Sequence, residues 1–165
     1  MKLCVIAVGH RMPEWVSAGF NDYAKRMPRE MVLTLTELKP EPRPSNAGDA
    51  AIARMVEAEA KRIRDATPKG AITVVLDETG KLVTTQGLSQ RLTKWREGGH
   101  DVALVIGSAD GTSAALKKNA QWLWSLSPLT LPHGLARVVL AEQLYRAWSL
   151  LGNHPYHRAG LRTED

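Results

Sequence analysis

The sequence predicts an α/β fold in which helices flank a mostly parallel sheet. Short apolar runs alternate along the chain with longer stretches whose apolar residues repeat at helical spacing, an order typical of α/β proteins. The run 101–107 (DVALVIG) is apolar almost throughout and bounded by turn residues, as expected of a strand buried in a parallel sheet. With 165 residues, the chain is long enough for one domain with its own core.

The first part of the chain predicts two strands around a helix. Residues 2–8 (KLCVIAV) form the first strand, in which Cys4 is expected to be buried, and 31–38 (MVLTLTEL) alternate as a second. Between them a helix opens at Pro13. Its core-facing residues are expected to be Trp15, Val16, Gly19, Phe20 and Tyr23. Their helical spacing favours a core role over base stacking.

A proline-rich loop and a basic helix follow. Residues 39–48 (KPEPRPSNAG) predict an extended loop, and 49–66 predict a helix with Asn46 as a possible cap. Glu57 and Lys61 have the spacing of a helical ion pair. The basic side chains of this helix either form a solvated face or face RNA, and the sequence leaves both open.

The second part of the chain predicts three more strands and three helices. The expected elements are a strand at 71–80 that runs into a turn, a helix at 84–99, the strand 101–107, a loop and helix at 108–120, a strand edge at 121–127 and a helix at 135–151. The last helix is apolar on most faces, which indicates burial.

Composition excludes several classes of protein. No run approaches the roughly 18 apolar residues of a membrane span, and the N-terminus resembles a strand more than a signal peptide, so we expect a cytoplasmic protein. A single cysteine excludes an intramolecular disulfide, and no histidine pair has metal-ligand spacing, so we expect no metal. The net charge of +5 modestly favours a polyanionic partner.

Common catalytic motifs are absent, and three loops remain as candidates for a site. The sequence contains no GxGxxG, GxxxxGK[ST], HExxH or GxSxG pattern. The loops at 76–80, 107–111 and 125–132 each follow an apolar strand. Ligands of parallel sheets bind outside the carboxyl ends of strands, so these loops are expected to converge on one pocket.

Three separated segments carry a family resemblance. They are KLCVIAVGHRMPEWVSAGFNDYAKRMP (2–28), DVALVIGSADG (101–111) and LTLPHGLARVVLAEQLYRAWSLLGNHPYHR (129–158). In this order they resemble the RlmH family of small SPOUT-class methyltransferases, which act on a pseudouridine of large-subunit ribosomal RNA. The resemblance covers nearly the whole chain.

The resemblance implies a single knotted α/β domain at 1–158, followed by a tail at 159–165 that is expected to be flexible. It implies a homodimer that methylates N3 of a pseudouridine in the assembled ribosome, with S-adenosylmethionine as cofactor. The positions that match the family's cofactor site are Leu76, Gly107, Ser108, Ser127, Pro128, Leu129, Thr130, Leu131 and Pro132.

The chain departs from the family pattern in the second loop. Relatives have I-G-G-P-E-G, whereas this chain has IGSADG at 106–111, with Ser108 in place of a glycine. If that position requires a positive φ, Ser108 is strained and the cofactor binds more weakly.

The resemblance assigns catalytic positions to Tyr156, His157 and Arg158. Arg158 suits a phosphate and Tyr156 can stack on a base. Loss of the N3 proton requires an acceptor, but for His157 we favour positioning of the base over general-base catalysis. The resemblance also implies that one subunit's tail completes the other's cofactor site. Weaker candidates are His10, Arg11 and His133.

Two other functions stay open at this point. The same chemistry could act on another RNA such as tRNA. Alternatively, Ser108 in the cofactor loop would suit a non-catalytic factor that binds or assembles ribosomes on an inherited fold.

Overall fold

The computed structural model describes residues 1–154 and Tyr156, and within these residues the chain forms a five-stranded parallel sheet with five helices. The strands are β1 (Lys2–Val8), β2 (Val32–Leu38), β3 (Ile72–Leu82), β4 (Val102–Ile106) and β5 (Trp122–Ser125). The helices are α1 (Glu14–Ala24), α2 (Asp49–Ala66), α3 (Thr85–Glu97), α4 (Ala114–Asn119) and α5 (His133–Leu151). The predicted α/β class is confirmed.

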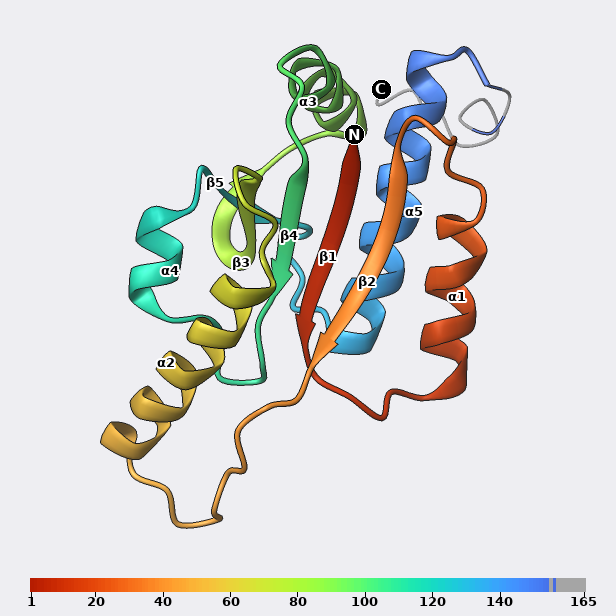
Figure 1. Ribbon diagram of the computed structural model, residues 1–165. Coiled ribbons are helices and arrows are strands. Elements are labelled where there is room, and N and C mark those ends of the chain that lie inside the picture. The colour runs from red at the N-terminus through yellow and green to blue at the C-terminus, as the bar shows by residue number, and fades with distance from the viewer. Residues whose placement is uncertain (155, 157–165) are drawn as a thin grey trace.

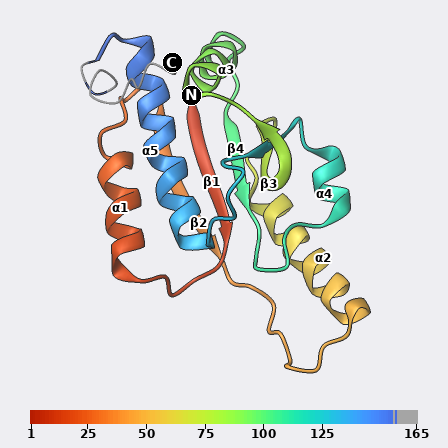
Figure 2. The same ribbon diagram turned by 180° about the vertical axis from the view of Figure 1, so that it is seen from behind.

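Helices cover both faces of the sheet, whose strand order is β2-β1-β4-β3-β5 (Figure 1). One core cluster joins α1, α3 and α5 to the strands, and Figure 2 shows α5 beside α1 on this side. A second cluster joins α2 and α4 to the opposite face. Because every ladder is parallel, the carboxyl ends of the strands meet at one edge. The knot that the resemblance implies stays a prediction.

Strand β3 does not end in the predicted turn. Leu76 and Lys81 both pair with Trp124, so residues 77–80 bulge out of the ladder before pairing resumes. The strand passes very close to β5 at Gly80, where a Cβ would lie 2.6 Å from the backbone N of Trp124. Such a bulge re-aims side chains, and here it directs residues 77–79 towards the cavity described below.

Helix α1 buries fewer residues than predicted. Val16 and Phe20 are buried, but Trp15 is 56% exposed, because it lies one position off the Val16–Phe20 stripe. Gly19 and Gly134 permit the close packing of α1 against α5: a Cβ at Gly134 would lie 2.9 Å from Val16. The prediction of a core role for Trp15 was therefore wrong.

Three smaller predictions also failed. Helix α2 is capped by Gly48 and not by Asn46. Lys61 forms its ion pair with Asp65 at 2.8 Å instead of with Glu57; Asp65 lies one turn further along α2. Cys4 is only half-buried.

Among the described residues, no helix has the length and apolar character needed to cross a membrane.

Candidate functional site

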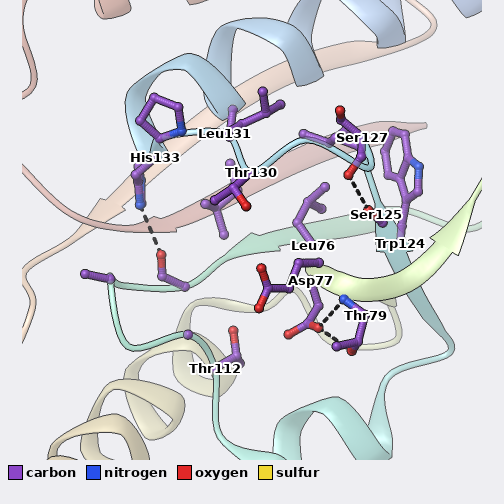
Figure 3. Close-up of a pocket in the computed structure, with 18 of the residues that line it drawn as sticks. Leu76, Asp77, Thr79, Thr112, Trp124, Ser125, Ser127, Thr130, Leu131 and His133 are labelled. Carbon is purple, nitrogen blue, oxygen red and sulfur yellow. Dashed lines mark hydrogen bonds between the residues drawn. The ribbon is translucent and has the colours of Figure 1, made fainter.

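The three predicted loops meet at the carboxyl edge of β3, β4 and β5 (Figure 3). Together they line a cavity of about 630 Å³. The predicted cofactor residues on its wall are Leu76, Gly107, Ser108, Ser127, Leu129, Thr130, Leu131 and Pro132; Pro128 is not among the lining residues. The convergence follows from parallel pairing, which brings the ends of sequence-distant strands together. Cofactor binding by these residues stays a prediction.

Gly107 is needed for close approach and not for an unusual backbone angle. A Cβ there would lie 2.6 Å from the Thr112 hydroxyl oxygen and 2.7 Å from the Gly111 carbonyl oxygen. The left-handed conformation of this loop falls instead on Gly111, with φ +81°. Ser108 has no positive φ, so the expected strain at Ser108 is absent.

The bulge of β3 contributes an acidic group that the sequence pattern did not single out. The Asp77 carboxylate accepts hydrogen bonds from the N–H and hydroxyl of Thr79 and pairs with Lys117 at 3.0 Å. Burial raises the pKa of Asp77, but these hydrogen bonds and the lysine outweigh it and lower the pKa below its usual value. Asp77 therefore carries a negative charge into the cavity wall at neutral pH.

The third loop forms an apolar wall held by short-range hydrogen bonds. The Ser125 hydroxyl donates to the Ser127 carbonyl at 3.0 Å, and the Ser127 hydroxyl accepts from the Leu129 N–H at 2.9 Å. Leu129 itself is 76% exposed at the rim. A restrained loop with proline ends presents its apolar side chains at low entropic cost.

A buried arginine links this cavity to the ends of two further strands. Arg137 on α5 is 1% exposed, and its Nη2 donates to the Gly9 carbonyl at 3.0 Å and its Nη1 to Glu37 at 2.8 Å. Its Nε donates to Nε2 of His133 at 2.9 Å. His133 must then be the Nδ1–H tautomer, which donates to the Gly107 carbonyl at 3.0 Å.

This arrangement gives His133 more weight than the sequence did. Burial, and then the positive charge of Arg137, lowers the pKa of His133. A neutral imidazole is required, because protonation would remove the acceptor that Arg137 uses. The sequence did not single out Arg137, because a charged residue in an apolar helix is expected to be exposed. In the structure, Arg137 is the largest fully buried side chain among the described residues.

Of the three predicted catalytic residues, the structure describes Tyr156 alone, and Tyr156 does not line the cavity. Its hydroxyl donates to Glu142 at 3.2 Å, and its ring packs edge-on against Tyr145 at 4.7 Å and beside Arg146. Burial, and then a hydrogen bond with Tyr23, raises the pKa of Tyr156, so the phenol stays protonated at neutral pH. His157 and Arg158 lie outside the described residues.

The distance and direction between Tyr156 and the cavity follow from the geometry of helix α5, which both contact. Ala136 is the last α5 residue on the cavity wall, and Tyr156 contacts α5 at Glu142, Tyr145 and Arg146. A rise of about 1.5 Å per residue puts these contacts roughly 9–15 Å further along the axis. At about 100° per residue, Tyr145 also points to the side opposite Ala136.

The weaker candidates differ in position. His10 and Arg11 are exposed, and Arg11 has a φ of +56°, whereas His133 lines the cavity. Within the part of the chain that the structure describes, no group of three or more histidine, cysteine or acidic side chains is placed to hold a metal.

Comparisons with known proteins find relatives that match nearly the whole chain. A family model described as "Predicted SPOUT methyltransferase" matches residues 1–157. A protein of Bordetella pertussis named "Ribosomal RNA large subunit methyltransferase H" is 55% identical over 159 residues, which cover 96% of this chain and all of the relative. Proteins of the same name from Ralstonia pickettii and Burkholderia mallei are each 54% identical to this chain, over 96% of its length. The matched region covers 99% of the Ralstonia pickettii protein and 100% of the Burkholderia mallei protein.

Proposed function

Because the chain belongs to the SPOUT methyltransferase family, we propose that it transfers a methyl group from S-adenosylmethionine to N3 of a pseudouridine in large-subunit ribosomal RNA. The single observation that carries this proposal is the full-length similarity to relatives named as ribosomal RNA large subunit methyltransferases. The cavity at the carboxyl edge supplies a site for the cofactor. We expect an enzyme that acts on ribosomal RNA in the assembled ribosome to work in the cytoplasm.

The cavity suits S-adenosylmethionine in size and charge. Its volume of about 630 Å³ is within the roughly 300–1,000 Å³ of small-ligand sites. Asp77, Glu78 and Asp110 line it together with Lys117. Lys117 pairs with Asp77 and Arg43 with Asp110, so Glu78 adds the negative charge that favours a ligand with cationic groups. Leu129 and Leu131 offer an apolar surface for adenine. The bound cofactor supplies the activated methyl group, and the residues of this chain hold it and exclude water.

We assign the acceptor role to the C-terminal end of the domain. N3 of the uracil-type ring gains the methyl group and loses its imide proton, so the ring and a proton acceptor must lie near the cofactor. Arg158 is proposed to bind a phosphate and His157 to position the base. Tyr156 is proposed to contact the base as a protonated phenol, which its raised pKa supports.

The separation of the two ends of α5 favours a homodimer in which one subunit's tail completes the partner's site. Tyr156 packs on the side of α5 away from the cavity of its own chain. Trp15 is 56% and Leu135 36% exposed, and each adjoins the Val16–Gly134 contact between α1 and α5. Two large apolar side chains near this contact suit a second copy of the chain.

Transfer of labelled methyl groups tests the reaction. Ribosomes that lack the modification, free subunits and bulk tRNA are each incubated with the enzyme and labelled S-adenosylmethionine. We expect label in large-subunit RNA alone, mapped to a pseudouridine. Label in tRNA would assign another substrate. Absence of label, from a folded protein that binds the cofactor, would favour a non-catalytic ribosome-binding factor.

Mixed dimers test the shared site. Arg158→Ala disables the tail, whereas Gly107→Val disables the cofactor loop, because a side chain at Gly107 meets the loop's own atoms. If the tail acts across the dimer, mixing the two inactive variants restores one intact site per mixed dimer and part of the activity. If the tail acts within its own chain, every mixture stays inactive, and the shared-site proposal is wrong.

A further inference from the structure

A buried carboxylate lies behind the second cavity loop. Glu59 on α2 is 2% exposed, and both of its oxygens accept hydrogen bonds. Oε1 accepts from Nη2 of Arg43 at 2.8 Å and from the Ser108 hydroxyl at 2.9 Å. Oε2 accepts from Nη1 of Arg43 at 2.9 Å and from the Glu41 N–H at 2.8 Å. Burial raises the pKa of Glu59, but these donors outweigh it and lower the pKa, so the group is charged at neutral pH.

Arg43 joins this carboxylate to the cavity loop at two points. Its Nε donates to Asp110 at 2.7 Å, and its Nη2 donates to the Ser108 hydroxyl at 3.0 Å. The guanidinium is held in turn by the Glu41 carbonyl at 2.7 Å. A planar guanidinium is suited to several fixed hydrogen bonds at once, which a lysine cannot reproduce.

These contacts anchor the middle of the cavity loop. The Ser108 hydroxyl both donates to Glu59 and accepts from Arg43. The loop is bordered by Gly107 and Gly111, and glycine gives a chain more freedom than any other residue. An anchor in the middle of such a loop reduces the entropy that a ligand must otherwise remove.

We propose that Arg43, Glu59 and Ser108 form a clamp that fixes the 107–111 loop in its cofactor-binding shape, which makes Arg43 and Glu59 positioning residues for S-adenosylmethionine. The proposal rests on the proposed function of the cavity. Neither residue lines the cavity, so each acts through Ser108 and Asp110. The proline-rich loop at 39–48 thereby becomes part of the support of the cofactor site.

A matched pair of variants separates support of the 107–111 loop from anchoring of the proline-rich loop at 39–48. Arg43→Met removes the contacts to Ser108 and Asp110. Arg62→Met is the control, because Arg62 ties the same proline-rich loop to α2 through Glu41 and the Lys39 carbonyl, without contacting the cavity loop. Each variant is titrated with S-adenosylmethionine by calorimetry, at a temperature at which urea titration shows it to be folded.

We expect Arg43→Met to weaken cofactor binding about tenfold, as for loss of a hydrogen bond to a charged group, and Arg62→Met to change it less than twofold. Ser108→Ala should weaken binding less than Arg43→Met does. The double variant Arg43→Met/Ser108→Ala should lose less affinity than the two single losses combined, because both changes act on one clamp. Arg43→Lys should recover only part of the loss.

Amide hydrogen exchange distinguishes anchoring of the 107–111 loop from a general effect on the stability of the fold. The Gly111 N–H donates to the Ser108 carbonyl at 2.9 Å, and it should exchange faster in Arg43→Met than in Arg62→Met. Equal cofactor affinity in wild type and folded Arg43→Met would overturn the clamp. A wild-type protein that binds no S-adenosylmethionine would instead overturn the proposed function.

Discussion

Replacement of Arg137 by methionine tests whether the buried arginine holds the strand ends together. Methionine keeps an unbranched chain that fills most of the space, but it removes three donors. The buried Gly9 carbonyl and Nε2 of His133 then lose their partner, at a cost of about 1–3 kcal/mol each. Glu37 is 42% exposed and regains water, so it adds little.

Together these effects give an expected loss of about 2–4 kcal/mol, because release of the arginine from burial offsets part of the cost. For a chain of this size, each kcal/mol corresponds to roughly 2–4 °C in Tm, so Tm should fall by about 4–16 °C. Urea titration gives the free energy of unfolding, and differential scanning calorimetry gives Tm.

Glu37→Gln is the matched control for this prediction. It removes the carboxylate that pairs with a guanidinium only 1% exposed and leaves the Gly9 and His133 contacts in place, so we expect a smaller loss than for Arg137→Met. A loss below about 1 kcal/mol for Arg137→Met would show that the buried hydrogen bonds contribute little to stability. Equal losses in the two variants would show that the ion pair, and not the buried hydrogen bonds, carries the effect.

Three further predictions concern pH, the cofactor loop and the dimer. The pKa of His133 is lowered in the folded state, so the unfolded chain binds a proton more readily than the folded chain does. The free energy of unfolding should therefore be full above about pH 6.5 and fall as the pH drops below that value. Urea titrations should show a shallower fall in His133→Gln. Gly107→Ala brings a Cβ to 2.6 Å and 2.7 Å from two loop oxygens and should weaken cofactor binding at least about tenfold, while Gly48→Ala, which meets nothing within 4 Å, should leave calorimetric affinity unchanged. If the proposed homodimer forms through α1, Trp15→Glu should convert it to monomer in analytical ultracentrifugation, with little change in monomer stability. A dimer that persists in Trp15→Glu would show that α1 is not at the interface.

Local sequence patterns determined most of the secondary structure. The runs at 2–8 and 101–107 are strands within one or two residues of their predicted bounds, since continuous apolar residues have few alternatives to a buried strand. The predicted loops also meet at one cavity, because parallel strands place their carboxyl ends together. The family resemblance implies a cofactor-binding role for these loops, which composition alone does not suggest and which stays a prediction.

The tertiary structure decided the features that depend on distant partners. Arg137 is buried because Gly9 and Glu37 lie beside it in space, although they are 128 and 100 positions away in the chain. Ser108 is unstrained because Gly111 takes the left-handed angle, and its hydroxyl is met by Arg43, 65 positions away. Propensity and periodicity report on neighbours within a few positions, whereas the burial of a charge depends on which groups the completed fold brings to it.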